Sequence, residues 1–156
     1  MSHFVTTTWQ GTTIFDSTIG NQTVRIDANS DPENKQGPNP KPLMLSSLAG
    51  CTGIDVVTLL KKMRVDIKTL RMDIEGELTD TVPKIYSLIR LKYYFTGEDL
   101  KVEKIIKAVK MSKEQYCGVS AMLAMVCPIE FSVYVNEELV YDKSTQADTE
   151  AKVTNT

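Results

Sequence analysis

Hydrophobic and polar positions alternate with a period of two in three early segments of the chain, which is the pattern of half-buried β-strands. The predicted strands are Val5–Gln10, Thr12–Ser17 and Asn21–Ala28. Gly11 lies between the first two and suits a hairpin turn. The segment that follows, up to Pro42, is polar and proline-rich, so a loop is expected there.

Apolar residues then surround a helical wheel on nearly every side between Leu43 and Met63. Pro42 suits the first turn of this helix, and Lys61 and Lys62 suit its C-terminal end. A helix that is apolar on all faces is expected to be buried on all faces. A single domain rarely encloses such a helix alone, so a second subunit is expected to help cover it.

Two longer segments, Lys68–Thr79 and Ile85–Phe95, return to the period of two and predict strands with one packed and one wet face. The residues between them, 80–83, are expected to form a turn.

Helical spacing returns in Asp99–Met111. Ser112 and Gln115 fit a capping box that would start a further helix, ending near Val126. Ile129–Val135 is then expected as the last main strand, with Leu139–Tyr141 as a partner.

This order of elements predicts an α+β fold, with antiparallel sheets packed around a long buried central helix. Residues 1–142 are expected to form a single domain, and residues 143–156 a disordered tail, because they contain little to bury. The formal net charge is −2, which gives no electrostatic reason to expect nucleic acid or an anionic membrane as a partner. No signal peptide or uninterrupted membrane span is recognisable, so a cytoplasmic location is expected.

The chain has three cysteines, Cys51, Cys117 and Cys127. An odd number in a reducing compartment favours catalytic, redox-active or simply buried cysteines over a disulfide framework. No metal is expected, because the only histidine is His3 and no two cysteines have ligand-like spacing.

Cys51 lies about two turns into the long helix, between Gly50 and Gly53. Each glycine costs the helix roughly 1 kcal/mol relative to alanine, so close packing or room for a small substrate should compensate. Asp55 lies one turn later on the same face, and a carboxylate beside a thiol disfavours the thiolate. A reactive thiolate would therefore need a cation from elsewhere. The candidates are Arg25, Lys41 and Lys61.

Cys117 lies near a predicted helix start, where partial exposure and unpaired N–H groups would favour a thiolate. The alternative for both Cys51 and Cys117 is a small buried hydrophobe. Sequence spacing alone does not establish whether the two thiols meet.

Four motifs in order resemble the OsmC/Ohr family, and most closely its OsmC-like, YhfA-type branch. They are Gly37-Pro38-Asn39-Pro40, the helix segment Leu48–Val57 around Cys51, the basic end Lys61–Arg64, and Ser112–Leu123.

The resemblance implies an intertwined homodimer that reduces organic hydroperoxides in a stress response and needs no cofactor. Cys51 would be oxidised to a sulfenic acid, and Cys117 would resolve it as a Cys51–Cys117 disulfide. A dithiol reductant, such as a lipoylated protein, would restore both thiols. An apolar pocket lined by Leu48, Ile54 or Met122 would favour organic peroxides.

The sequence departs from the family pattern at two points. Lys41 stands where the hydroperoxide reductases have a glutamate, and no arginine precedes Arg25. The alternatives are therefore a non-peroxidatic dimer that binds an apolar small molecule or runs another thiol reaction, and an interaction protein whose cysteines only pack. Cys127 precedes a predicted strand and is interpreted as structural.

Overall fold

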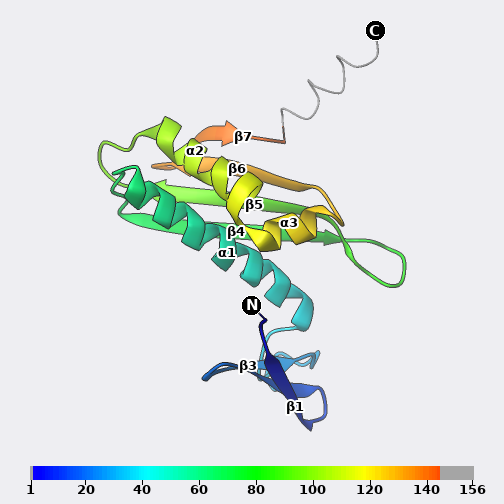
Figure 1. Ribbon diagram of the computed structural model, residues 1–156. Helices are drawn as coiled ribbons and strands as arrows, with labels where there is room; N and C mark the ends of the chain where they lie inside the picture. The colour runs from blue at the N-terminus through cyan, green and yellow to red at the C-terminus, as the bar shows by residue number, and fades with distance from the viewer. Residues whose placement is uncertain (1, 145–156) are drawn as a thin grey trace. The chain divides into compact units, whose positions relative to one another are not determined.

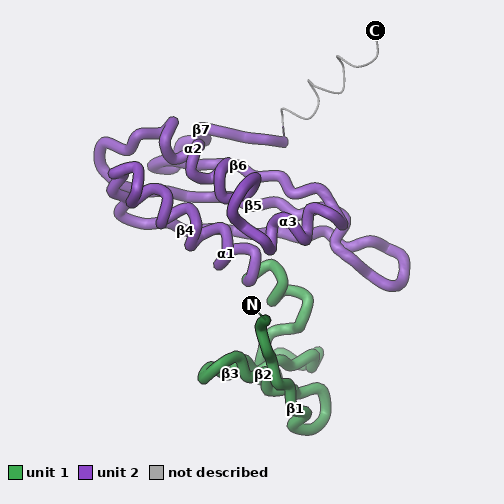
Figure 2. Tube along the Cα trace, viewed as in Figure 1, with its two compact units in different colours: residues 1–46 green, residues 47–156 purple. Residues whose placement is uncertain are grey.

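The computed structural model describes residues 2–144 and divides the chain into two compact units, one up to Ser46 and one from Ser47 onwards (Figures 1 and 2). The predicted single domain 1–142 stays a prediction. The predicted tail falls almost wholly outside the described residues, although Lys143 still donates its backbone N–H to the carbonyl of Phe131.

The first unit is a three-stranded antiparallel sheet in the order β1-β2-β3. Its strands are β1 (Val5–Gly11), β2 (Ile14–Ile19) and β3 (Gln22–Asp27). The predicted strand start at Thr12 is wrong, because Thr12, with a φ of 48°, and Thr13 form the turn between Gly11 and Ile14. The hairpin therefore turns just after the position predicted from Gly11.

The second unit contains a four-stranded sheet in the order β4-β5-β6-β7. Its strands are β4 (Thr69–Leu78), β5 (Tyr86–Thr96), β6 (Ile129–Val135) and β7 (Glu138–Asp142). β5 and β6 are parallel, which corrects the expectation of purely antiparallel sheets. The reason is the long crossover between them. Its helices carry the chain back to the end of the sheet where β5 begins, so β6 runs in the same direction as β5.

The helix α1 (Pro40–Lys62) is 23 residues long and begins three residues earlier than predicted. Pro40 and Pro42 both fit its first turn, where a proline loses no intrahelical hydrogen bond. By length and composition α1 could cross a membrane, but the core helix of a soluble protein meets the same criteria.

The expectation that this helix is buried on all faces is not met by the single chain. One stripe of α1 packs into the core of the second unit, whereas Ile54 is 67% exposed and Val57 is also exposed. The packed stripe consists of Leu48, Thr52, Val56, Leu59 and Leu60.

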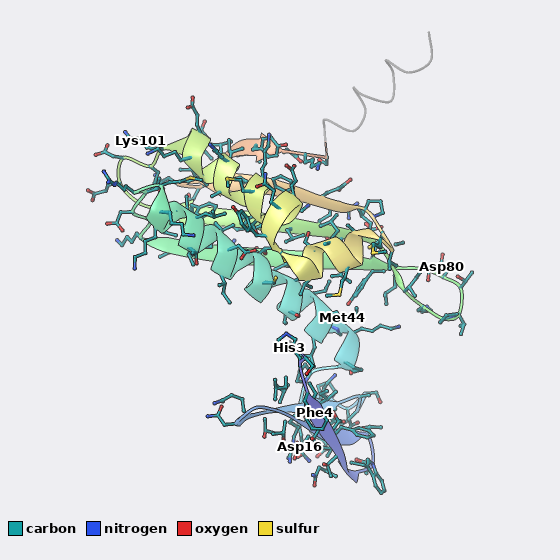
Figure 3. The ribbon with its side chains drawn as sticks, viewed as in Figure 1. His3, Phe4, Asp16, Met44, Asp80 and Lys101 are labelled. Carbon is teal, nitrogen blue, oxygen red and sulfur yellow. The ribbon has the colours of Figure 1, made fainter. Side chains whose placement is uncertain are left out.

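The helices α2 (Val102–Met111) and α3 (Gly118–Ala124) cover the same face of the sheet as the second-unit part of α1 (Figure 1). α2 starts later than predicted because Asp99 has a φ of 47°, which is incompatible with a right-handed helix. Asp80 marks the loop between β4 and β5, and Lys101 immediately precedes α2 (Figure 3).

The predicted capping box at Ser112 is wrong. Ser112 has helical dihedral angles, and α2 continues through a wide π-helical turn, Ser112–Tyr116. Cys117 is the residue that caps α3, because its sulfur accepts a hydrogen bond from the backbone N–H of Ser120 at 3.2 Å. The Ser112 hydroxyl donates instead to the carboxylate of Asp55 on α1.

Candidate dithiol site

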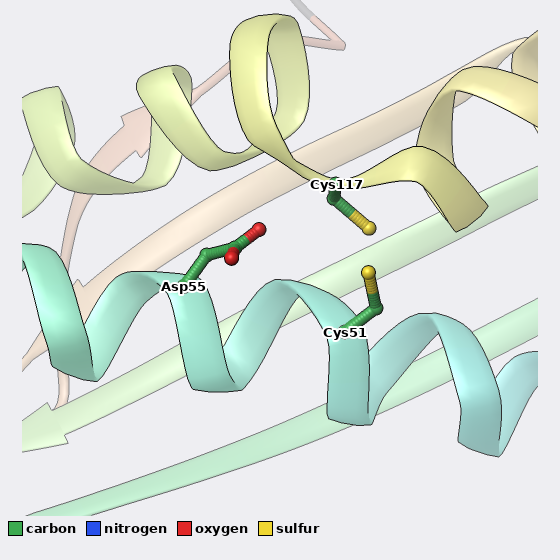
Figure 4. Close-up of side chains that lie close together, drawn as sticks. All are labelled: Cys51, Asp55 and Cys117. Carbon is green, nitrogen blue, oxygen red and sulfur yellow. The ribbon is translucent and has the colours of Figure 1, made fainter. Parts of the chain in front are cut away.

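Cys51 and Asp55 lie on one face of α1 because residues four apart in an α-helix are stacked one above the other. Both side chains point toward the junction between the π-helical turn and α3 (Figure 4). Both residues are partly buried. A helix is a rigid support, so the relative position of these two groups is set by the backbone of α1.

Cys117 reaches the same place from the other side. The π-helical turn ends at Cys117, whose extended backbone (φ −75°, ψ 103°) redirects the chain into α3. Its backbone N–H donates to the carbonyl of Ser112 at 2.7 Å, which anchors the junction. The Cys117 side chain is only 2% exposed, so the expectation of partial exposure is wrong.

The Cys51 sulfur, the Cys117 sulfur and a carboxylate oxygen of Asp55 all lie within 4.8 Å of one another (Figure 4). The fold therefore brings together two thiols that are 66 positions apart in the chain. We call these three residues the dithiol cluster. Their chemical roles remain predictions, but the proximity that those roles require is present.

Ser112 ties the cluster to the core. Its buried hydroxyl lies 3.1 Å from Asp55 Oδ2 and 3.3 Å from the carbonyl oxygen of Thr52, so it donates to acceptors on α1. This contact orients the Asp55 carboxylate. Ser112 does not cap a helix, because its own backbone is helical and the chain continues from α2 into the π-helical turn.

The electrostatics of Cys117 oppose a thiolate. Burial raises the pKa of the Cys117 thiol to about 11, and the neighbouring Cys51 thiol adds to the rise. Hydrogen bonds from the backbone N–H groups of Ser120 and Val119 act in the opposite direction but do not offset burial. The expectation that N–H groups at this helix start would produce a thiolate is therefore wrong, and Cys117 is a protonated thiol at neutral pH.

Tyr93 is a member of the site that sequence reasoning did not find. It is fully buried on β5, and its hydroxyl has no hydrogen-bond partner within residues 2–144. Burial raises its pKa well above the ordinary value, and the charges of Cys117 and Asp55 raise it further. The Thr52 hydroxyl moderates this rise, but it donates its own proton to Leu48 and its placement does not meet hydrogen-bond geometry with Tyr93.

Lys113 is a second member that was missed. Its ammonium donates to the carbonyl of Ile129 at 2.8 Å and lies 4.5 Å from the centre of the Phe131 ring. Burial lowers its pKa to about 8, and a negative charge on the Cys117 sulfur would raise it again. Only its position in the tertiary structure reveals it, because in the sequence it is one lysine among many.

Arg25, Lys41 and Lys61 are the cations predicted to stabilise a Cys51 thiolate. Arg25 donates to both carboxylate oxygens of Asp16, at 2.7 and 2.8 Å, and to Gln36. Arg25 and Lys41 belong to the first unit, so their predicted influence on Cys51 stays a prediction. Lys61 lies ten residues beyond Cys51, which is about 15 Å along a helix axis. Among the described residues no lysine, arginine or histidine forms an ion pair with Asp55.

The residues predicted to line an apolar pocket are differently placed. Leu48 is completely buried in the core, whereas Ile54 and Met122 are 67% and 63% exposed. Two surface cavities of the second unit lie elsewhere, one along β5 and β6 and one along α2. A pocket that combined these three residues would need a further surface over α1 and α3.

The remaining predictions concern the glycines and Cys127. A side chain at Gly53 would approach the Met72 sulfur at 3.2 Å, so close packing accounts for this glycine, whereas Gly50 faces open space. Cys127 is buried, burial raises the pKa of its thiol, and it takes no part in the cluster. These surroundings fit the interpretation of Cys127 as structural.

The fold and the cluster define a class of α+β protein in which a helix-borne cysteine faces a second cysteine at a helix junction. The OsmC-like protein family model matches residues 30–132, and the chain belongs to this family.

Similar proteins support that assignment. Protein YhfA of Escherichia coli K12 is 31% identical over 126 residues, which cover 81% of this chain and 92% of YhfA. A hypothetical protein from Aquifex aeolicus is 29% identical, with a TM-score of 0.79 and coverage of 87% and 97% of the two chains. An organic hydroperoxide resistance protein OsmC from Legionella pneumophila is 18% identical, with a TM-score of 0.64 and coverage of 86% and 98%, and so shares the fold.

Proposed function

We propose that the protein is a cytoplasmic thiol-dependent reductase of organic hydroperoxides. The observation that carries the proposal is the approach of the Cys51 and Cys117 sulfurs to within 4.8 Å, next to the Asp55 carboxylate. Membership of the OsmC-like family and structural similarity to a hydroperoxide resistance protein support it. Cys51 is assigned as the attacking thiol, because it is the more exposed of the two.

In the first step the Cys51 sulfur attacks the distal oxygen of the hydroperoxide. The O–O bond breaks, the alkoxide takes up the thiol proton and leaves as alcohol, and Cys51 becomes a sulfenic acid. In the second step the Cys117 sulfur attacks the Cys51 sulfur. A disulfide forms and the hydroxyl group leaves as water.

The second step needs a proton acceptor, because the Cys117 thiol has a pKa of about 11 and is protonated at neutral pH. The Asp55 carboxylate lies within the dithiol cluster and is the group placed to receive that proton as the sulfur attacks. A dithiol reductant, such as a lipoylated protein, then transfers two electrons and two protons to the disulfide and restores both thiols.

We also propose that the working form is a homodimer. The single chain exposes large apolar side chains along α1 and α3, which a monomeric soluble protein rarely presents as a group. Those of the second unit are Ile54 and Val57 of α1, Met122 of α3, and Met125 and Val126 directly after α3. A second copy seated here would cover α1 and would place an apolar lining near Ile54 and Met122, where an organic peroxide could bind.

The test is stopped-flow consumption of cumene hydroperoxide by the reduced, chelator-treated protein. Wild type and Cys127→Ser should react at equal rates, whereas Cys51→Ser should lose the reaction. Cys117→Ser should complete the first oxidation and accumulate a sulfenic acid that dimedone traps. Equal rates for wild type and Cys51→Ser would overturn the proposal.

A second candidate is the non-peroxidatic dimer that binds an apolar small molecule. The absence of an ion-paired cation at Asp55 in the described chain favours it, because no described ion pair brings a positive charge to the dithiol cluster. Alkylation of Cys51 across a pH series distinguishes the two. An ordinary thiol profile would favour this candidate, and rapid alkylation at neutral pH would favour the reductase.

A further inference from the structure

The dithiol cluster has the composition of a metal site. Cys51 and Asp55 are four residues apart on α1, a spacing that directs two ligands from one helix toward one point. Cys117 faces them from the start of α3, and the three donor atoms lie within 4.8 Å of one another. No two cysteines have a ligand-like spacing in the sequence. One helical turn and a tertiary contact nevertheless bring three possible ligands together.

We propose that Cys51, Asp55 and Cys117 bind one divalent transition metal ion of the zinc class when both thiols are reduced. Thiolate sulfur is a soft ligand that selects zinc over magnesium or calcium. Two thiolates and one carboxylate leave a fourth position for water, as in zinc sites with three protein ligands. The binding of this ion does not depend on the proposed peroxide reduction.

The distances are compatible with this ion after a small adjustment. Two sulfurs at 2.3 Å from a tetrahedral zinc are about 3.8 Å apart. The donor atoms here are no more than 4.8 Å apart, so side-chain rotations that close a gap of about 1 Å are sufficient. Cys51 and Asp55 are only partly buried, which leaves them room to rotate.

The second observation is the Tyr93 hydroxyl. It is fully buried and has no hydrogen-bond partner in the described chain. It is also close enough to Cys117 and Asp55 for negative charge on either group to raise its pKa. A buried polar group without a partner calls for an occupant of the space beside it. A water bound to the metal would supply that partner.

Ser112 has the role that such a site needs around its ligands. Its hydroxyl donates to Asp55 Oδ2, which orients the carboxylate and leaves the other oxygen available. Groups that hold metal ligands in this way commonly change metal affinity 10- to 100-fold when they are removed. None of the described ion pairs includes Asp55, so its negative charge is available to a bound cation.

Metal binding and thiol oxidation would exclude each other, because a Cys51–Cys117 disulfide removes both sulfur ligands. This consequence rests on the proposed function. In a cell, the metal would protect the reduced cluster, and oxidation would release it.

The test uses Co²⁺ as a spectroscopic substitute for Zn²⁺, added to untagged, reduced, metal-free full-length protein. We expect one Co²⁺ per chain, with sulfur-to-metal charge-transfer absorption and the intense visible bands of a four-coordinate ion, both abolished by Zn²⁺. Cys51→Ser and Cys117→Ser should each lose at least half of the charge-transfer intensity. Cys127→Ser, which removes a buried thiol outside the cluster, should match wild type.

Tyr93→Phe and Ser112→Ala probe the surroundings. Both should retain the charge-transfer spectrum while binding Zn²⁺ about tenfold more weakly in competition with a chromophoric chelator. Circular dichroism confirms that each variant is folded. Absence of charge-transfer absorption in wild type, or an unchanged spectrum in Cys51→Ser, would overturn the proposal. Hydroperoxide consumption by the metal-free protein is a separate measurement, so either proposal can fail without the other.

Discussion

Cys51 and Cys117 are the same side chain in two different environments. Cys51 is partly exposed on a helix face, whereas Cys117 is buried at the start of a short helix. Burial disfavours charge on sulfur more strongly than two backbone N–H groups favour it. The difference supports the proposal that the two thiols act in different steps of a thiol reaction.

The first prediction concerns the Cys117 thiol in the presence of a chelator. Its pKa of about 11 lies about two units above the ordinary value, so iodoacetamide should modify it about 100-fold more slowly near pH 8 than the same cysteine in urea. Mass spectrometry resolves the three cysteines. A rate for Cys117 that levels off below pH 9 would contradict the prediction.

The second prediction concerns the Tyr93 hydroxyl. Since it is buried without a partner in residues 2–144, Tyr93→Phe should leave the free energy of unfolding of the metal-free protein unchanged or raise it by about 1 kcal/mol. Urea denaturation measures this. A clear loss of stability would show that the hydroxyl forms a hydrogen bond in solution.

At the scale of elements, the loop between β3 and α1 is organised by one carboxylate. Asp27 accepts hydrogen bonds from the backbone N–H groups of Gln36 and Asn29 and from the Thr13 hydroxyl. The backbone N–H of Asp27 donates to Pro38, which completes the closure of the loop. Gly37 allows this close approach, because a Cβ there would lie 2.5 Å from the Arg25 carbonyl oxygen.

The third prediction is therefore that Gly37→Ala destabilises the protein, by about 1–3 kcal/mol, because the clash is with backbone that has little freedom to move. Gly50→Ala is the matched control. It lies inside α1 with no described atom within 4 Å of its Cβ position, so alanine should stabilise the helix by up to about 1 kcal/mol. Thermal denaturation of both variants checks the opposite signs.

The fourth prediction is the pH dependence of this loop. Hydrogen bonds from Gln36, Thr13 and Asn29 lower the pKa of Asp27. A lowered pKa contributes stability that is present above the unfolded-state pKa and is lost as the pH falls through the folded-state pKa. Asp27→Asn should therefore be less stable than wild type at pH 7, and the difference should shrink on acidification toward pH 3. A difference that grows on acidification would contradict this.

At the scale of the whole molecule, one chain does not cover its own apolar surface. The side of α1 that carries Ile54 faces away from the packed stripe, and α3 carries further exposed apolar residues such as Met122. Such surfaces associate in water because apolar area is removed from solvent.

The fifth prediction follows for the oligomeric state. Wild type should sediment as a dimer, and Ile54→Lys should shift the population to monomer, because the new charge would be buried at the contact. Val82→Lys is the control, since Val82 is an exposed apolar residue in the loop between β4 and β5. A monomeric wild type, or dissociation by both variants, would contradict the prediction.

The sequence pattern was sufficient for most elements because it reports local burial. The strand around Ile89 was found from a period of two, and the long helix around Val56 from apolar residues on nearly every side of a helical wheel. The same reasoning was wrong at Ser112, because α2 continues through its helical backbone into the π-helical turn and no helix starts there. Asp99 was misassigned because its left-handed φ leaves no periodic signal.

By itself, the sequence determined the order of the helices and strands, the face of α1 that carries Cys51 and Asp55, and the resemblance to the family, because these depend on neighbours along the chain. Only the tertiary structure decided that Cys117 lies beside them, that β5 and β6 are parallel, and that the buried Tyr93 and the partly buried Lys113 lie near the thiols. The physical reason is that these contacts depend on the path of the intervening chain. That path results from the simultaneous packing of the helices on the sheet, which no single segment specifies.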